Sequence, residues 1–419
     1  MSKRILIIGG GVAGLCTAYF CARRGFNVTV VERKSARRDG CSFGNAGMVV
    51  PSHFVPLAAP GAVASALKWM WNPASPFYVR PRWDADLLGW GMKFWRAANA
   101  EHVRRAAPLL RDLALASRAV YEEFAAQPGS DFGLVKRGLL MLCHERHTLD
   151  EEAKTAEEAR ALGIPAEVLD AKLTARLDPD ARLDIAGAVY FPLDCHLTPE
   201  RFMAALQTQV ERLGVDFLWD SEVLGWKIEN RGRIRAVILS GDRETEADEF
   251  VLCGGSWSPG LARRLGLNIP IQAGKGYSLT LPEPRQRPRL CSILIEAHVA
   301  VTPMGDTLRV GGTMEIAGLN EDINPVRVRG IIDSFCKYFP DFRPEDFDGV
   351  RPWCGLRPCS PDGLPFVGRA KAFSNLSLAT GHAMMGMTLG PVTGKLIARI
   401  ISGEEPPLDL ALLSPDRYN

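Results

Sequence analysis

The chain has 419 residues, enough for two or more hydrophobic cores, and its apolar fraction of 47% and charged fraction of 23% are those of a folded globular protein. A net charge of +2 excludes nucleic acid and an anionic membrane as the main electrostatic partner. No apolar run reaches the roughly 18 residues that span a bilayer, and the ten cysteines lack metal-ligand spacing, so we expect no metal site and reduced thiols.

The first predicted elements form a nucleotide-binding unit. An apolar strand over residues 5–8 leads into Gly9, Gly11 and Gly14, and a second apolar strand ends at Glu32. These glycines allow a tight turn, close approach to a pyrophosphate and close helix packing, while the acid can bind the ribose hydroxyls. An ordinary strand-to-helix turn would explain the glycines alone, but not the strand before Glu32. A secretory signal would explain Lys3 and Arg4 before an apolar run, but the glycines interrupt that run and the strand before Glu32 would have no role in it. The motif does not separate NAD from FAD.

A tryptophan-rich stretch follows. Five of the nine tryptophans are Trp69, Trp71, Trp83, Trp90 and Trp95. We favour a helical layer of a substrate domain whose aromatic side chains fill a core. The alternative is a surface that contacts a membrane or a partner protein.

The remaining elements are expected from periodicity and turn signals. Helices are predicted over residues 109–124, 151–162, 199–213, 326–338 and 390–401, and strands over 139–142, 187–191, 215–218, 222–228, 233–239, 250–253 and 376–379, with a β-rich block over 269–314. Because no regular strand and helix series follows the first unit, its sheet has to be completed by distant segments. We expect the chain to return to this sheet twice. The first return is the hairpin and the strand that leads into Gly254, and the second is the C-terminal strand and helix.

Six segments in this order resemble the D-amino acid oxidase superfamily of flavoproteins and, within it, the bacterial D-amino acid dehydrogenases. They are the glycine motif with Glu32 and the segments 41–47, 275–278, 353–358, 361–365 and 379–382. The resemblance implies an α/β fold with a Rossmann-like FAD-binding domain built from residues 1–56, 196–266 and 356–419. It also implies an α+β substrate-binding domain, with a mostly antiparallel sheet, built from 57–195 and 267–355. Its cofactor would be noncovalent FAD.

The resemblance also assigns cofactor-binding residues. Ser42 would donate its hydroxyl to phosphate, while Asn45, Ala46 and Gly47 would offer N–H groups near the ring; a simple Gly/Asn turn is the alternative. The backbone of Val223 would contact the adenine. The other expected contacts are Val12, Ala13, Arg33 and Gly254.

The turn before the last helix carries a second set of expected contacts. Gly381, His382, Gly386, Met387 and Thr388 would direct N–H groups and a helix dipole at the flavin pyrimidine edge. A helix cap without a ligand is the alternative. For His382, a backbone or packing role is as well supported as a catalytic one.

Arg357 is the expected catalytic-site cation, which would hold a substrate carboxylate with two parallel hydrogen bonds. A structural ion pair with Asp362 is the alternative. Tyr277 and His53 are candidates for the pocket wall. With the carboxylate fixed, a hydride would pass from Cα to flavin N5 without a general base, giving an imine and then a 2-oxo acid and ammonia.

The substrate side chain is expected to be larger than that of glycine. Where glycine oxidases carry a second Arg and a Tyr, this chain has Met384 and Ala300. These residues favour a larger D-amino acid or a cyclic one such as hydroxy-D-proline over glycine or sarcosine.

The sequence analysis therefore predicts an FAD-dependent D-amino acid dehydrogenase that passes electrons to a quinone or another carrier. A non-catalytic alternative is a flavin-holding subunit of an electron-transfer complex. We expect a cytoplasmic protein, with peripheral contact at the inner face of a membrane as a hypothesis for the tryptophan-rich stretch.

Overall fold

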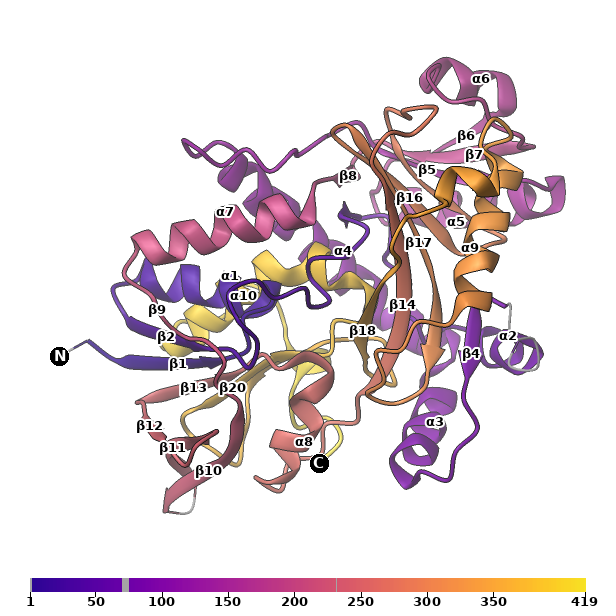
Figure 1. The fold of residues 1–419 in the computed structure, drawn as a ribbon. Coiled ribbons are helices and arrows are strands. Elements are labelled where there is room, and N and C mark those ends of the chain that lie inside the picture. The colour runs from indigo at the N-terminus through magenta and orange to yellow at the C-terminus, as the bar shows by residue number, and fades with distance from the viewer. Residues whose placement is uncertain (1, 70–74, 231) are drawn as a thin grey trace.

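The computed structural model describes residues 2–69, 75–230 and 232–419. Its strands form two large sheets that lie side by side, with helices packed around them (Figure 1). Each sheet is assembled from segments that are far apart in the sequence. All ten cysteines are free thiols.

The first sheet has six strands in the order β19-β20-β13-β1-β2-β9 and is parallel except at its β19 edge. Its strands are β1 (Arg4–Ile8), β2 (Asn27–Val31), β9 (Asp216–Leu218), β13 (Glu249–Leu252), β19 (Phe366–Arg369) and β20 (Leu376–Thr380). The central strands are apolar because both faces of the sheet are covered. The expectation that distant segments complete the first unit is therefore confirmed.

Helices cover one face of this sheet, and a small sheet covers the other. The helices are α1 (Val12–Ala22), α4 (Ala100–Ala125), α7 (Pro199–Arg212) and α10 (Gly386–Ile401), which share one hydrophobic core with the sheet. The opposite core includes side chains of β10 (Val223–Asn230), β11 (Arg233–Leu239) and α8 (Ser258–Arg263), with β12 (Glu244–Glu246) at the edge of the small sheet.

The second sheet has nine strands and is mostly antiparallel. Its strands are β4 (Phe77–Val79), β5 (Leu139–Cys143), β6 (Glu167–Asp170), β7 (Gly187–Phe191), β14 (Gln272–Leu281), β15 (Cys291–Leu294), β16 (Val299–Met304), β17 (Thr307–Ile316) and β18 (Trp353–Cys359). The long helix α9 (Pro325–Tyr338) packs on one face. The other elements are α2 (Ala62–Trp69), α3 (Ala85–Ala97), α5 (Arg146–Ala161), α6 (Ala171–Leu177), β3 (Met48–Val49) and β8 (Cys195–His196).

The predicted fold class is confirmed, but three helices begin at least four residues earlier than predicted. Helix α5 begins at Arg146 rather than at residue 151. Helix α4 begins at Ala100 and runs through Pro108, and α10 begins at Gly386 rather than at residue 390. Although α4 comes from a segment expected in the substrate domain, it packs into the core of the first sheet. The domain boundaries themselves stay a prediction.

Two glycines of α10 allow it to lie against α1. A Cβ at Gly394 would lie 2.4 Å from the backbone carbon of Cys16, and a Cβ at Gly390 would lie 2.7 Å from a methyl carbon of Val12. Residues four apart share one face of a helix, so these positions form a strip without side chains along the contact. The close contact fixes α10 relative to α1.

Gly394→Ala is therefore expected to destabilise the protein, although alanine has the higher helix propensity. The added methyl group would meet backbone atoms that cannot move aside, at a cost of about 1–3 kcal/mol. We expect a fall of roughly 2–6 °C in the thermal unfolding midpoint. Gly91→Ala in α3 is the matched control because no atom lies within 4 Å of its added Cβ. Equal midpoints for the two variants would contradict the packing argument.

Candidate flavin and substrate site

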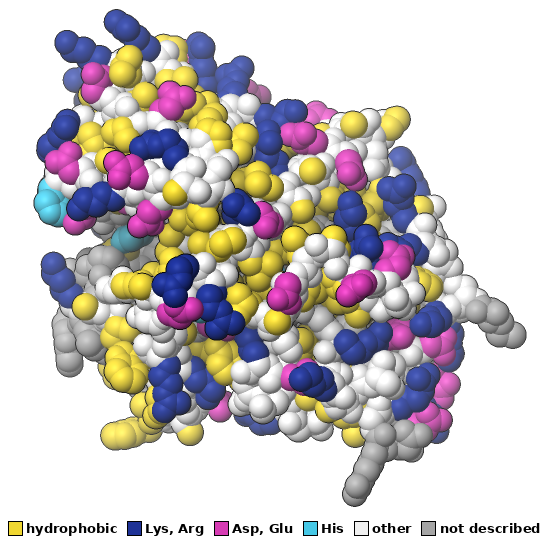
Figure 2. Space-filling model, turned by 180° about the vertical axis from the view of Figure 1, so that it is seen from behind, with side chains coloured by type: hydrophobic (Ala, Val, Ile, Leu, Met, Phe, Trp, Pro, Cys, Tyr) yellow, Lys and Arg dark blue, Asp and Glu magenta, His cyan; other side chains and the backbone are white. Residues whose placement is uncertain are grey.

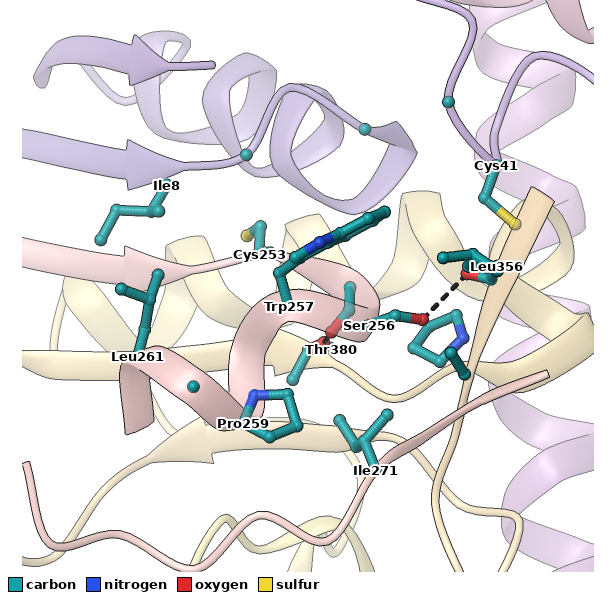
Figure 3. A pocket seen from close by; sticks show the side chains of 18 of the residues that line it. Ile8, Cys41, Cys253, Ser256, Trp257, Pro259, Leu261, Ile271, Leu356 and Thr380 are labelled. Carbon is teal, nitrogen blue, oxygen red and sulfur yellow. Dashed lines mark hydrogen bonds between the residues drawn. The ribbon is translucent and has the colours of Figure 1, made fainter. Parts of the chain in front are cut away.

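A cavity of about 700 Å³ opens at the carboxyl edge of the parallel strands. Ile8, Cys253 and Thr380, at or just beyond the ends of three neighbouring strands, all line it, and Figure 3 shows them around one space. Nucleotides bind at this edge of open α/β sheets. The predicted cofactor residues in the lining are Gly9, Gly11, Val12, Ala13, Glu32, Arg33, Ser42, Asn45, Val223, Gly254, His382, Gly386 and Met387.

The turn between β1 and α1 has the shape that a pyrophosphate requires. A Cβ at Gly9 would lie 2.6 Å from the carbonyl oxygen of Cys253, and one at Gly14 would lie 1.9 Å from the carbonyl oxygen of Gly9. The Val12 N–H donates to Ser42 Oγ at 3.0 Å, so the hydroxyl hydrogen of Ser42 is free to donate to a phosphate. Helix α1 has no capping side chain at Gly11, and its N-terminus faces the cavity.

Glu32 has a structural role as well as a place in the cavity. Its carboxylate accepts hydrogen bonds from the N–H groups of Gly10 at 2.8 Å and Lys34 at 3.0 Å. These bonds hold the turn and leave further lone pairs directed at the cavity for ribose hydroxyls. The glycine turn, the helix end and the acid together fit the adenosine diphosphate part of FAD.

The N-terminus of α10 lies at the other end of this lining. Its first residues, Gly386 and Met387, line the cavity, and Met385 at the cap makes no side-chain hydrogen bond to the helix. The first N–H groups of α10 can therefore face a flavin carbonyl. Burial lowers the pKa of His382 to about 4, so its ring is neutral at physiological pH, and Nε2 lies 2.9 Å from Thr393 Oγ1. This side chain packs against α10.

Five predicted cofactor residues do not line the cavity: Gly14, Ala46, Gly47, Gly381 and Thr388. At Gly47, with φ at +73°, a Cβ would lie 2.2 Å from the carbonyl oxygen of Leu197, so the position requires glycine for packing. The Thr388 hydroxyl accepts from the Val50 N–H and donates to the Met48 carbonyl oxygen, which ties α10 to the β3 segment. Gly47 and Thr388 therefore hold the backbone around the cavity without lining it.

Arg357 lies on β18 between two cavity-lining residues, Leu356 and Pro358. Its Nη1 donates to the carbonyl oxygen of Thr313 at 2.6 Å. Among the described residues it has no ion pair, and Asp362, the alternative partner, pairs instead with Arg417. Its positive charge also acts on Cys41 of the lining, whose pKa burial raises to about 11 against the opposing effect of Arg357. Arg357 itself does not line the cavity; it is a cation without an acidic partner among the described residues, and it lies beside the cavity between two lining residues.

Tyr277 is not at the pocket wall. Its side chain lies in the core beneath α9, and its hydroxyl donates to Glu315 Oε2 at 2.9 Å. Successive side chains of a strand point to opposite faces. On β14, Gly276 faces Arg357 and Ser278 donates to the Gly44 carbonyl oxygen, so Tyr277 between them points away from the site.

His53 belongs to a cluster beside the site rather than to the cavity lining. Its Nδ1 lies 3.1 Å from Ser52 Oγ, and Ser52 donates through both its N–H and its hydroxyl to the fully buried carboxylate of Asp194. Burial lowers the pKa of His53 to about 4, so the ring is neutral at physiological pH. Burial raises the pKa of Asp194 to about 7, partly opposed by Ser52 and by the charge of Arg118.

Met384 and Ala300, expected to make the pocket apolar, have different surroundings. Met384 is 48% exposed and does not line the cavity, whereas Ala300 and the neighbouring Met385 pack in one cluster with Ala46 and Ile293. Neither Ala300 nor Met385 lines the cavity, so these residues do not form the apolar wall expected of this cavity. The turn before α10 determines which of the two methionines packs in the interior, and the sequence alone does not predict which one it is.

Several lining residues were not predicted. They include Arg38, Cys41, Ser256 and Trp257. The Ser256 hydroxyl donates to the Leu356 carbonyl oxygen at 2.9 Å, joining the turn after β13 to β18 (Figure 3). The Arg33 guanidinium lies 3.7 Å from the centre of the Trp257 ring. For Ser256 and Trp257, the sequence signal is a polar and an aromatic residue directly after Gly254-Gly255, at the end of an apolar strand.

The buried Asp194 gives a testable pH dependence. Its pKa is about 7 in the folded protein but about 4 in an unfolded chain, so the folded state holds the proton more tightly. Stability is therefore lost as the pH rises from about 4 to 7. Asp194→Asn removes this loss, and its advantage over wild type in the free energy of unfolding should grow by about 1–3 kcal/mol between pH 5 and pH 8. Identical pH profiles in urea unfolding would rule this out.

Comparison with known proteins agrees with the geometry. The family model described as "FAD dependent oxidoreductase" matches residues 4–400. D-amino acid dehydrogenase from Allorhizobium ampelinum is 35% identical over 99% of this chain and 98% of its own length, and that from Paramagnetospirillum magneticum is 34% identical over 99% of each. Among solved structures, glycine oxidase from Geobacillus kaustophilus covers all of both chains with a TM-score of 0.79 at 23% identity. L-proline dehydrogenase from P. horikoshii covers 100% of this chain and 98% of its own, with a TM-score of 0.75 at 18% identity. The chain thus belongs to the FAD-dependent oxidoreductase family of D-amino acid oxidase type.

Proposed function

We propose that this protein is a D-amino acid dehydrogenase that oxidises the amine next to a carboxylate and passes the electrons to a quinone or a similar carrier. The proposal rests on Arg357, a cation without a carboxylate partner among the described residues, which lies between two residues that line a flavin-sized cavity. The family and the names of the relatives support the same reaction.

The residues of the cavity fit FAD, and different residues would hold different parts of the cofactor. Gly9, Gly11, Ser42 and the end of α1 would hold the pyrophosphate, and Glu32 the ribose. When bound, FAD supplies the acceptor for the two electrons that leave the substrate.

Arg357 would fix the substrate by its carboxylate with paired N–H donors. Fixing one end of a small amino acid limits the positions that its Cα can take, which is how orientation lowers a barrier. Loss of a hydride from Cα and of a proton from the amine nitrogen breaks the C–H and N–H bonds and gives an imine. Water then hydrolyses the imine to a 2-oxo acid and ammonia, while a cyclic imine can persist.

The apolar cluster around Ala300 favours substrates with an apolar or cyclic side chain. Ile293 and Ala300 are partners across β15 and β16, and both pack with Met385 against one hydrophobic cluster. A cyclic D-amino acid such as hydroxy-D-proline is therefore the second candidate substrate. Glycine and sarcosine would leave this apolar surface without contact.

The exposed face of α3 supports contact with a membrane, where a quinone would be found. Leu88, Met92 and Trp95, at a spacing of i, i+4 and i+7, are 56–66% exposed, and Trp83 before the helix is fully exposed. Hydrophobic side chains and basic ones lie together around α3, at the lower left of Figure 2. The opposite face of α3 is packed through Trp90, whose indole donates to the Cys359 carbonyl oxygen.

The tryptophan-rich stretch thus has both a packed and an exposed part. Trp71 and the side chain of Trp69 lie outside the described residues. Within the described ranges, no helix is long and apolar enough to cross a bilayer. Arg82, Asp84 and Asp86, at the start of α3, line the cavity, so a surface-bound α3 would bring the cavity close to the membrane.

Replacing Arg357 tests the reaction. Anaerobic mixing with a panel of D-amino acids should bleach the flavin of the wild type, and Arg357→Ala should lower the bleaching efficiency by about 100-fold or more, because charged hydrogen bonds contribute roughly 1.5–3 kcal/mol each. Arg357→Lys should fall between the two, since it keeps the charge and loses the paired donors. If no D-amino acid bleaches the wild type, the flavin-holding subunit becomes the better account. Unchanged bleaching in Arg357→Ala would remove Arg357 from the reaction.

Replacing the exposed aromatics tests the membrane contact. Changing Trp83 and Trp95 together to Ala should weaken binding to vesicles of anionic phospholipid by at least 10-fold, since burying one such side chain contributes about 1.5–3 kcal/mol. Ile228→Ala, at another exposed apolar position, is the control. Sedimentation with vesicles measures the binding. Equal sedimentation of all three proteins would count against α3 as the contact surface.

A further inference from the structure

Strand β17 contains a bulge directly opposite Gly276. The pairing of β14 with β17 passes from Lys275 and Glu315 to Tyr277 and Gly312, so two residues, Thr313 and Met314, lie opposite one. Thr313 has φ at +64°, in the left-handed region that β-branched residues rarely adopt. Strained backbone of this kind persists only where the surroundings hold it, and it is concentrated at functional sites.

On the side of the cavity, the bulge meets Arg357. The carbonyl oxygen of Thr313 accepts the hydrogen bond from Nη1 at 2.6 Å. The guanidinium lies over Gly276, where an added Cβ would be 2.2–2.4 Å from Nη1, Cζ and Nη2. One donor is thus fixed by the bulge, and the absence of a side chain at Gly276 provides the space. Four of the five guanidinium donors stay available for a ligand.

On the opposite side of the sheet, a buried ionic cluster holds the same segment. Glu315, the residue after the bulge, accepts from the Tyr277 hydroxyl at 2.9 Å and lies 3.8 Å from Lys275 Nζ and 3.6 Å from Arg327 Nε. All four side chains are buried. Removing the carboxylate would leave two buried cations with less compensation, so the cluster resists a shift in strand register. Lys275 is also bonded to Asn320 Oδ1 and the Asp322 carbonyl oxygen, each at 2.8 Å.

We infer that Gly276, Thr313 and Glu315 are positioning residues that hold the Arg357 guanidinium ready for a carboxylate before the substrate arrives. The inference rests on the proposed function, because it takes Arg357 as the carboxylate-binding group. Tyr277 then acts indirectly. Its hydroxyl donates to Glu315, which holds β17 in place, and the bulge of β17 presents the Thr313 carbonyl oxygen to Arg357. These contacts hold a strained threonine in the middle of the sheet.

Gly276→Ala tests the inference directly. The atoms that its Cβ would meet belong to the end of a flexible side chain, so the fold can persist while the guanidinium is displaced. In the FAD-loaded enzyme, we expect unchanged flavin content and an unfolding midpoint close to that of wild type. The dissociation constant for benzoate, an unreactive carboxylate titrated through the flavin absorbance, should rise at least 10-fold. The KM for a D-amino acid should rise in parallel.

A second glycine serves as the matched control. Gly225→Ala on β10 makes only ordinary contacts, the nearest at 3.5 Å, and should bind benzoate like the wild type.

The outcomes separate the positioning role from the reaction itself. Weaker benzoate binding in both Arg357→Ala and Gly276→Ala supports the inference. If Arg357→Ala weakens binding and Gly276→Ala does not, the positioning role is overturned while the proposed function stands. If Arg357→Ala leaves benzoate binding unchanged, Arg357 is not the carboxylate-binding group, and both proposals fail.

Discussion

The hydrogen bond from Arg357 to the Thr313 carbonyl oxygen links the nine-stranded sheet to the site beside the cofactor cavity. It belongs to the nine-stranded sheet, yet it holds a charge beside a cavity that opens from the six-stranded sheet. An Arg without an acidic partner is costly to keep partly buried, because its desolvation is not offset by an opposite charge. A carbonyl oxygen offsets part of that cost and leaves the charge itself unneutralised. The remaining compensation is what an anionic ligand would supply.

The two sheets position different groups around the site. The six-stranded sheet places two helix N-termini, of α1 and α10, around one cavity, and their mutual position is set by glycine-mediated packing of backbone on backbone. The nine-stranded sheet presents side chains from strands whose register is fixed by a buried ionic cluster. Helix ends suit phosphates and a flavin carbonyl, since they offer N–H groups, whereas a strand suits a single oriented guanidinium. This difference suits a large cofactor held at the six-stranded sheet and a small anionic substrate held at the nine-stranded sheet.

The sequence predicts the parts of this arrangement that depend on local chemistry. The glycine motif, the hairpin and the return of the chain at Gly254 follow from residue type and spacing, and the half-buried Arg357 is a candidate through the family resemblance. What it does not predict depends on strand face and register. Tyr277 lies one residue from Gly276 and so faces the opposite side of β14, and no single-sequence signal reveals the bulge that sets this alternation against β17. Likewise, the inward face of α3 takes Trp90 and leaves Trp95 exposed, which only the packing partner decides.

The most direct measurement is a crystal structure of the FAD-loaded protein with bound benzoate. We predict a carboxylate bound by two N–H groups of Arg357, with Nη1 still donating to the Thr313 carbonyl oxygen and the guanidinium over Gly276. A carboxylate bound elsewhere in the cavity, or Arg357 turned away from Gly276 toward an acidic side chain of the protein, would contradict it.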